Sequence, residues 1–166
     1  MVELVACPGC GARFNARTGP THAYVGASAE CWAAFGELGQ RELGLGISGP
    51  PRLSVHAYMV QHPGQPGRRE AQSVGVHLMV LAAVLEDGLT PATAVAAMPV
   101  WLAGHPAFPW LEPPAHPASI TIRDLPESAD RPTHEAAVRA WARAIWLDWA
   151  VHQPTIRRWL SRGRPG

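Results

Sequence analysis

Apolar residues recur every three or four positions along several stretches of this chain, and prolines or glycines separate those stretches. Such spacing places the apolar side chains on one face of a helix. The first stretch begins at Ser28 and ends at Gly44. Ser28 suits the N-cap, because its hydroxyl can accept a hydrogen bond from a free N–H of the first turn. We therefore expect a helix over 28–44, with Cys31 and Leu38 turned toward the core.

Three further helices are predicted from the same spacing and from the residues that end each run. His62 lies at the end of the first of them, before Pro63 and Gly64. His77 lies within the apolar stripe of the second. Proline lacks the N–H that a helix interior needs, so Pro99 is expected to end the third. These helices cover about 53–62, 72–87 and 90–98.

The rest of the chain combines a proline-rich segment with a long amphipathic helix. Prolines interrupt every regular pattern over 99–132, and the large apolar side chains there indicate a loop wrapped over the core. One short strand is expected at 119–122. A long helix is predicted over 133–152, until Pro154 kinks or ends it, and a final helical turn follows at 155–161.

Together these elements predict a mainly α-helical bundle that forms a single domain over residues 1–166. A chain of this length buries roughly 70% of its extended surface on folding, so its core does not depend on a staple. The predicted parts are a loop-rich metal-binding arm at 1–27, helices at 28–98, the proline-rich loop at 99–132 and C-terminal helices at 133–161.

Two cysteines separated by two residues give the chain its most specific chemical signal. Cys7 and Cys10 flank Pro8 and Gly9, and Gly11 follows. Proline and glycine allow the tight turn that points both thiolates at one ion, and soft sulfur ligands favour zinc over hard cations such as magnesium. This turn is therefore predicted to be a zinc knuckle, which supplies half of a zinc site.

The other half would come from the third cysteine and a histidine, because zinc takes four ligands in structural sites. His22 is the preferred histidine, since it lies between Cys10 and Cys31 and keeps the site within one segment. His152, at the end of the last long helix, is the alternative and would arrive by tertiary contact. A closed site formed by three cysteines, Cys7 included, and one histidine would order the arm and would not catalyse a reaction.

A second hypothesis makes the histidines catalytic. His62 and His77 fall on the apolar faces of neighbouring predicted helices. Together with His22 or His152 they would bind a metal with an open position, as a metal-dependent hydrolase requires. His56 lies about 120° from His62 around an ideal helix, so these two do not reach one ion. The structural alternative is that each is a core histidine, hydrogen-bonded to a tyrosine or a backbone carbonyl.

Two other motifs match enzyme signatures, but their surroundings favour structural roles. The run 44–49 spells GxGxxG, yet it follows a helix and precedes Pro50, so we interpret it as a linker and not as a dinucleotide site. Cys31 and Trp32 at a helix start are similar to the nucleophile region of papain-like proteases. Glu30 stands where that family has a small residue, and the cysteine pair nearby gives Cys31 a simpler role as a ligand.

Composition removes several classes of function. All 14 basic residues are arginine, which excludes Schiff-base, nucleophilic and phosphate-loop lysines. The net charge of +1 provides no general field for nucleic acid or anionic lipid. No apolar run approaches the roughly 20 residues that span a bilayer. Three cysteines without a secretory signal are typical of a cytoplasmic metal-binding protein. We expect no membrane association, and a protein or a small molecule as the partner.

Nucleic-acid binding is the third hypothesis, because zinc modules often bind nucleic acid and arginines gather near the C-terminus. The chain has no basic excess elsewhere and no recognisable reading motif, so nucleic acid is not the expected partner. The alternative is an exposed, solvated C-terminal face. The arginines concerned are Arg157, Arg158, Arg162 and Arg164.

Several short motifs occur in order along the chain: CPGCG at 7–11, GPTHAY at 19–24, CW at 31–32, AYMVQHPG at 57–64 and QSV at 72–74. Together they resemble an uncharacterised family of small bacterial proteins, a domain of unknown function. The resemblance covers nearly the whole chain and implies a bacterial source, but no reaction or substrate. The family pattern has aspartate at the position of His56, which implies that His56 is not a required ligand. The leading prediction is a zinc-stabilised accessory or interaction protein.

Overall fold

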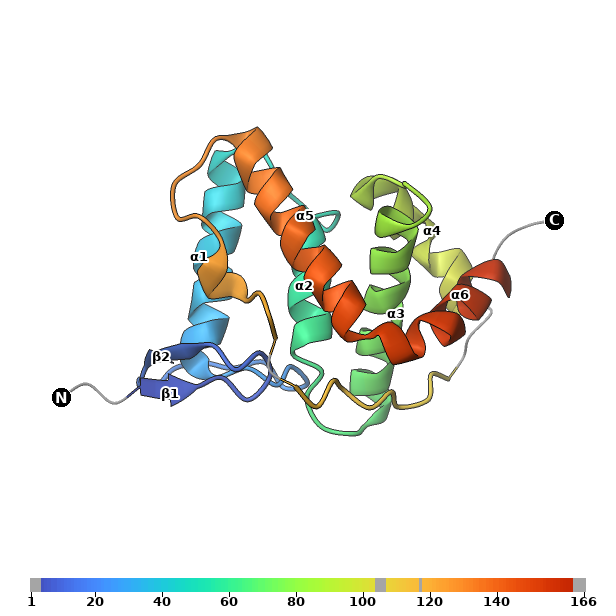
Figure 1. Cartoon of the computed structure of the whole chain (residues 1–166), viewed down its shortest axis with the longest axis horizontal. Coiled ribbons are helices and arrows are strands. Elements are labelled where there is room, and N and C mark those ends of the chain that lie inside the picture. The colour runs from blue at the N-terminus through green and yellow to red at the C-terminus, as the bar shows by residue number, and fades with distance from the viewer. Residues whose placement is uncertain (1–3, 104–106, 117, 163–166) are drawn as a thin grey trace.

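The computed structural model describes residues 4–103, 107–116 and 118–162. Within these residues the chain is mainly helical, with one two-stranded antiparallel sheet, which confirms the predicted fold class (Figure 1). The elements in chain order are β1 (Leu4–Ala6), β2 (Arg13–Asn15), α1 (Ala29–Gly44), α2 (Leu53–Gln61), α3 (Arg68–Leu85), α4 (Pro91–Ala103), the 3₁₀ helix η1 (Ile122–Asp124), α5 (Arg131–Asp148), the 3₁₀ helix η2 (Ala150–His152) and α6 (Gln153–Arg162).

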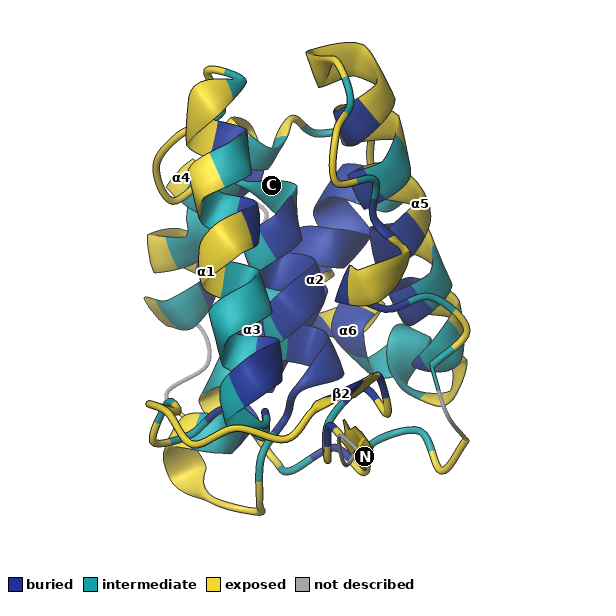
Figure 2. Cartoon of the chain, turned by 90° about the vertical axis from the view of Figure 1, so that its left-hand side faces the viewer, coloured by how far each residue is buried: buried dark blue, intermediate teal, exposed yellow. Residues whose placement is uncertain are grey.

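Helix α2 forms the centre of the bundle. It is buried along most of its length and has α1, α3 and α5 around it (Figures 1 and 2). Its Tyr58 stacks on Phe35 of α1 with a ring-centroid distance of 4.0 Å. Gln61 accepts a hydrogen bond from the indole N–H of Trp141 on α5 over 3.2 Å and donates one to the carbonyl of Ile120 over 2.8 Å. These bonds satisfy a buried amide and fix the C-terminal end of α2.

A buried carboxylate joins three helical segments. Glu42, near the end of α1, is only 2% exposed. It accepts hydrogen bonds from Arg52 over 2.9 Å and from Ser54 over 2.8 Å. The Nε2 atom of His134 on α5 lies 3.2 Å from its other oxygen. Because a buried charge is stable only when it is paired and hydrogen-bonded, this network specifies how α1, α2 and α5 meet.

The start and the end of α1 agree with the prediction. Ser28 is the N-cap, and its Oγ accepts a hydrogen bond from the N–H of Cys31 over 3.3 Å. The helix ends at Gly44. The GxGxxG run 44–49 continues from this end into a loop that leads to α2, as a linker would.

The prediction that Pro99 ends the fourth helix is wrong, because α4 continues through this proline to Ala103. Proline removes one backbone hydrogen bond from a helix interior. Ala94 and Trp101 lie two turns apart on α4, and both are buried. Packing on both sides of the proline therefore maintains the helix, since tertiary contacts supply most helical stability in proteins.

Between α4 and α5, the described residues 107–116 and 118–130 cross the bundle mostly as a loop, as the prolines predict (Figure 1). Its Leu111 and Leu125 are buried against the core. The strand predicted at 119–122 is wrong, because Thr121 instead caps the 3₁₀ helix η1. The N–H of Thr121 donates to the carboxylate of Asp124 over 2.7 Å, which completes a capping box. This local hydrogen bonding competes with strand formation.

The predicted long C-terminal helix is interrupted. Helix α5 ends at Asp148, and the turn η2 separates it from α6, whose second residue is Pro154. Proline is tolerated there because the first N–H groups of a helix have no helical partner. In the part of the chain that the structure describes, no helix is long and apolar enough to cross a lipid bilayer.

Candidate metal centre

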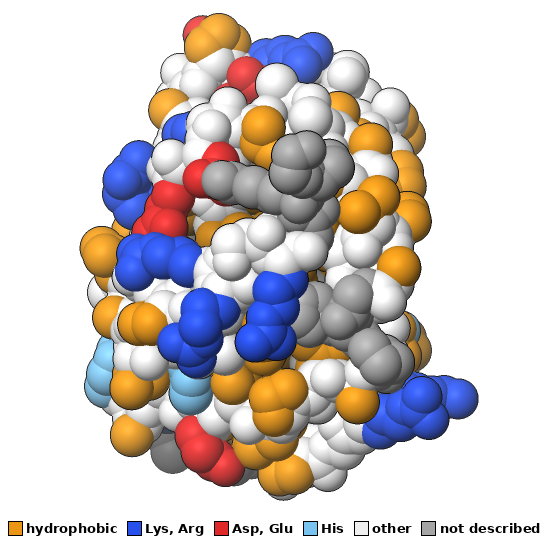
Figure 3. All heavy atoms as spheres, turned by 90° about the vertical axis from the view of Figure 1, so that its right-hand side faces the viewer, with side chains coloured by type: hydrophobic (Ala, Val, Ile, Leu, Met, Phe, Trp, Pro, Cys, Tyr) orange, Lys and Arg blue, Asp and Glu red, His pale blue; other side chains and the backbone are white. Residues whose placement is uncertain are grey.

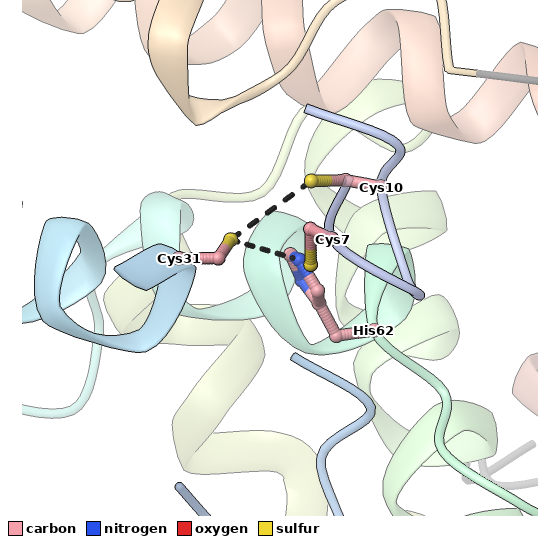
Figure 4. A group of neighbouring side chains, drawn as sticks. All are labelled: Cys7, Cys10, Cys31 and His62. Atoms are coloured by element: carbon pink, nitrogen blue, oxygen red, sulfur yellow. Dashed lines mark hydrogen bonds between the residues drawn. The ribbon is translucent and has the colours of Figure 1, made fainter. Parts of the chain in front are cut away.

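Three sulfur atoms and one imidazole nitrogen converge where the N-terminal hairpin meets the start of α1 and the end of α2 (Figure 4). They belong to Cys7, Cys10, Cys31 and His62, and their ligand atoms all lie within 4.8 Å of one another. Each of these residues is at most 2% exposed. Residues from three separate parts of the chain therefore form one buried set of metal-binding side chains.

The first two cysteines are held by the tight turn between β1 and β2. The strands pair antiparallel, with Val5 opposite Phe14. Between them, the N–H of Cys7 donates to the carbonyl of Ala12 over 2.8 Å, and the N–H of Gly11 donates to the carbonyl of Cys7 over 2.9 Å. Gly11 has a φ of +76°, a conformation that favours glycine. In Figure 4 the sulfur of Cys10 points toward Cys31 in the first turn of α1, and the sulfur of Cys7 lies beside the ring of His62.

Cys31 occupies the first turn of α1. Its Sγ lies 3.9 Å from the Sγ of Cys10 and 3.3 Å from the Nε2 of His62. The hydroxyl of Tyr58 donates a weak hydrogen bond to the same sulfur over 3.5 Å. A helix N-terminus carries partial positive charge, which would help to stabilise the Cys31 thiolate, the form that binds metals, once a cation is bound.

The ring of His62 is fixed in the orientation that a metal ligand requires. Its Nδ1 lies 2.7 Å from the backbone carbonyl oxygen of Tyr58, so Nδ1 carries the proton and donates it. This contact selects the tautomer whose Nε2 lone pair faces the sulfur atoms. The carbonyl of His62 in turn accepts a hydrogen bond from the N–H of Gly26 over 3.2 Å. That bond ties the arm to the end of α2.

The three thiols share charge unevenly. Hydrogen bonds from Cys10 and Cys31 lower the pKa of Cys7 far below the ordinary value of a thiol. Hydrogen bonds with Cys10 and Cys7, together with burial, raise the pKa of Cys31 far above it. Without a cation these contacts favour the thiolate form of Cys7 and the thiol form of Cys31. A divalent cation would stabilise all three as thiolates, so metal binding would release protons.

The distances suit a tetrahedral zinc ion. With Zn–S of about 2.3 Å and Zn–N of about 2.0 Å, tetrahedral angles put two sulfurs about 3.8 Å apart and a sulfur and a nitrogen about 3.5 Å apart. The distances of 3.9 Å between Cys10 and Cys31 and of 3.3 Å between Cys31 and His62 are close to these values. Thiolate-rich ligand sets favour zinc over magnesium or calcium. The residues present therefore fit zinc.

The structure brings the three predicted cysteines together and places His22 and His152 elsewhere. The ring of His22 packs against Trp32, with the ring centroids 5.3 Å apart. The Nε2 atom of His152 lies 2.8 Å from the backbone carbonyl oxygen of Glu112. The histidine beside the cysteines is His62. Proximity in sequence favoured His22, whereas the fold brings His62 to the cysteines.

A signal for His62 is present in the sequence. Pro63 and Gly64 end the helix directly after His62. The side chain of His62 therefore lies at a helix terminus, where it can contact residues of other elements. Helical spacing also places Tyr58 one turn earlier, where its carbonyl is the natural partner of a histidine N–H. The spacing does not show which cysteines this helix end would meet.

The four histidines of the hydrolase hypothesis do not gather at one point. His62 belongs to the cysteine group, whereas the Nδ1 of His77 lies 2.8 Å from the Nδ1 of His56. His22 and His152 have the separate contacts given above. Among the residues with described positions, these histidines do not form a three-ligand metal site with an open position.

The C-terminal arginines have local partners. Arg157 forms an ion pair with Glu86 over 2.6 Å, and Arg158 donates to the hydroxyl of Thr155 over 2.9 Å. Arg164 lies outside the described residues. On the face that carries α4 and α6, acidic and hydrophobic side chains interrupt the basic ones (Figure 3). What is described of this face is therefore not the continuous basic surface that favours nucleic acid.

Comparisons with known proteins yield a family but no activity. The model of a family of unknown function (DUF5946) matches residues 5–150, a range that includes all four residues of the candidate metal centre. No curated protein and no solved structure matches the chain.

Proposed function

The chain belongs to the DUF5946 family, whose function is unknown, and from its site we propose a zinc-stabilised accessory or interaction protein. One zinc ion is bound by three thiolates and one imidazole, and its role is structural. The proposal includes a cytoplasmic location in a bacterium, where free thiols stay reduced. The ligands are Cys7, Cys10, Cys31 and His62.

The observation that carries the proposal is the burial of all four ligand atoms within 4.8 Å of one another. The three cysteines are not joined by disulfide bonds. Three small thiols around one imidazole form few hydrogen bonds and bury little apolar surface. In a core without a metal, larger apolar side chains at these positions would stabilise the fold more. A zinc ion accounts for the choice of all four residues at once.

The physical role of the metal is to order the arm. Residues 4–28 contain two strands of three residues each and otherwise irregular backbone. Fixing such a segment costs about 1–2 kcal/mol of conformational entropy per residue, which short strands recover poorly. A zinc ion would link this segment through the knuckle to the starts and ends of two helices, and the binding free energy of the metal would then contribute to folding.

The site supports a structural metal better than a catalytic one. Four protein side chains complete the tetrahedral coordination of zinc, whereas catalytic zinc keeps one position for water or substrate. Cys31 has no exposed surface and His62 only 1%. A substrate therefore has no route to the ion while the four ligands are in place. We propose that the protein acts through its surface, with a protein or a small molecule as its partner.

Elemental analysis of the purified protein tests the proposal, with two single histidine variants as a matched pair. We expect one zinc per chain in the wild type and in His22→Ala, but substoichiometric zinc in His62→Ala. Circular dichroism shows whether each variant retains its helices. Loss of zinc in His22→Ala with retention in His62→Ala would overturn the ligand set, and a metal-free wild type that keeps an ordered arm would overturn the role.

A further inference from the structure

A groove of about 430 Å³ lies between α3 and α4, away from the four candidate zinc ligands. Its polar wall is a single stripe on α3, which includes Arg69, Gln72 and Ser73 and ends at His77. Positions three and four apart on a helix share one face, so these side chains line the groove together. Met98 and Leu102 of α4 form part of the opposite, apolar wall. The groove thus has a polar and an apolar side.

His77 is bonded through its inner edge to a second histidine. The Nδ1 atoms of His56 and His77 lie 2.8 Å apart, and His56 is 2% exposed. This is a hydrogen-bond distance. Two nitrogens bound to one tetrahedral zinc ion would lie about 3.3 Å apart. The geometry therefore favours one shared proton between the rings over a shared metal.

Burial keeps both rings neutral. It lowers the pKa of His56 to about 3, with a smaller contribution from the charge of His77, and it lowers the pKa of His77 to about 4. At neutral pH each ring then carries a single proton, and one Nδ1 donates to the other. Two arrangements satisfy this bond. If His56 donates, the Nε2 of His77 carries a proton and is a donor; if His77 donates, its Nε2 holds a lone pair and is an acceptor.

The buried Nε2 of His56 decides between the two arrangements. Among the residues that the structure describes, it has no hydrogen-bond partner. An unpaired buried N–H is rarer in proteins than an unpaired acceptor, so this nitrogen holds a lone pair and the proton of His56 is on Nδ1. His56 then donates to the Nδ1 of His77, which leaves His77 with its proton on Nε2. Because Nδ1 of His77 is bonded to His56 and His77 lines the groove, Nε2–H is the ring N–H of His77 that is left for a ligand there.

The groove therefore presents donors and one positive charge. Arg69 is exposed, and no carboxylate occurs among the described residues that line the groove. Gln72 and Ser73 add an amide and a hydroxyl beside it. A guanidinium group and a neutral N–H donor together recognise the oxygens of an anion. Leu102 faces them across the groove and provides contact for an apolar group.

We propose that this groove binds a small organic anion, whose charged group accepts hydrogen bonds from Arg69 and from the Nε2–H of His77 and whose apolar part packs on Met98 and Leu102. His56 is a positioning residue, because its bond fixes the tautomer of His77 without touching the ligand. Tyr24, from the metal-binding arm, also lines the groove. The site goes beyond the structural role of zinc, and its test does not require the zinc assignment to be correct.

Nuclear magnetic resonance on the full-length labelled protein tests this site, with phenyl phosphate and benzoate as anionic probes and benzyl alcohol as a neutral one. We expect saturable shifts of the Gln72 and Ser73 amides with the two anions only. Arg69→Gln should weaken binding about tenfold or more, because it removes a charged hydrogen bond. Arg68→Gln is the matched control, since Arg68 is exposed and does not line the groove, and it should leave binding unchanged.

Nitrogen shifts of the imidazole rings test the tautomers independently. We expect a protonated Nε2 on His77 and a protonated Nδ1 on His56. His56→Asn keeps a donor toward His77 and should bind the probes nearly as well as the wild type, whereas His56→Leu should bind them more weakly. The proposal is overturned if neither anion shifts the groove, if benzyl alcohol binds equally well, if Arg69→Gln binds like the wild type, or if added zinc titrates the histidine pair.

Discussion

The Nε2 of His62 lies 3.3 Å from the Sγ of Cys31, although the two residues are 31 positions apart in the chain. One stands at the end of α2 and the other in the first turn of α1. Their approach depends on the packing of these helices, in which Tyr58 takes part. The ligand set is therefore complete only after the helices have assembled, so metal binding and docking of the arm are coupled.

Removing the metal should release the arm and leave the central helices folded. After chelation at neutral pH, we expect rapid hydrogen exchange of the Cys7 and Gly26 amides, which bond to Ala12 and to His62. The amides of the buried stretch 78–84 in α3 should stay protected, because this helix is deeply buried and supplies none of the four ligands. Exchange mass spectrometry measures both regions in one experiment. Equal protection of the arm with and without metal would contradict the account.

Gly9→Ala should weaken zinc binding through a steric effect. A Cβ at Gly9 would lie 2.5 Å from Cδ2 of His62 and 2.6 Å from the carbonyl oxygen of Gly26. Neither neighbour can move without disturbing the ligand ring or the docked arm, so we expect zinc affinity to fall about tenfold or more in competition with a chelator. Gly36→Ala is the control. Nothing lies near its added Cβ, and it should raise stability by about 0.5–1 kcal/mol.

Glu42→Ala should be strongly destabilising. The carboxylate is 2% exposed and bonds to Arg52, Ser54 and His134. Its removal leaves buried donors unpaired, for which we expect a loss of about 3–5 kcal/mol in the free energy of unfolding. Glu37→Ala on the same helix is exposed and should change stability by less than about 0.5 kcal/mol. Denaturant titration measures both, and similar losses would contradict a structural role for this network.

The histidine pair should make the fold sensitive to mild acid. In the unfolded chain a histidine titrates near pH 6.5, whereas in the folded protein the pKa values of His56 and His77 are lowered to about 3 and about 4. Between about pH 4 and 6.5 the unfolded chain binds more protons, so the free energy of unfolding falls as the pH decreases through this window. Denaturant titration measures the free energy of unfolding at pH 7.5 and at pH 5. The decrease between these two pH values should be at least about 1 kcal/mol smaller in the double variant His56→Asn, His77→Gln than in the wild type.

This comparison separates the pair from the metal centre. Acid also protonates the cysteine thiolates and releases zinc, but that effect is common to the wild type and the double variant. Only the difference between the two proteins reports on His56 and His77. If their stabilities decline in parallel with pH, the two rings are not buried in neutral form.

Local chemistry explains which parts of the fold the sequence predicts. The hydroxyl of Ser28 and the CPGC turn act within a few residues, and both have the expected local structure. Pro99 and Thr121 show where local reasoning ends. At Pro99, buried contacts on both sides keep α4 helical. At Thr121, a hydrogen bond with Asp124 stabilises a 3₁₀ helix in place of the predicted strand. Neither outcome is visible in apolar spacing, because each depends on neighbours that the spacing does not identify.

The same limit applies to the candidate site. The cysteines could be identified because thiolates at this spacing have few other uses, but the choice of histidine depends on tertiary structure. His22 lies nearer to Cys31 in sequence, yet its ring packs on Trp32. His62 is selected by the path of α2 and by the carbonyl that orients its ring. Proximity in sequence is thus a poor predictor of a metal ligand when the end of a distant helix can supply that ligand.

X-ray absorption at the zinc edge, on the protein loaded with one equivalent of zinc, identifies the ligand atoms of the ion. We expect a four-coordinate ion with three sulfurs at about 2.3 Å and one imidazole nitrogen at about 2.0 Å, and loss of that nitrogen in His62→Ala. Two or fewer sulfurs, an oxygen from bound water in the wild type, or a nitrogen that persists in His62→Ala would contradict a closed site formed by Cys7, Cys10, Cys31 and His62.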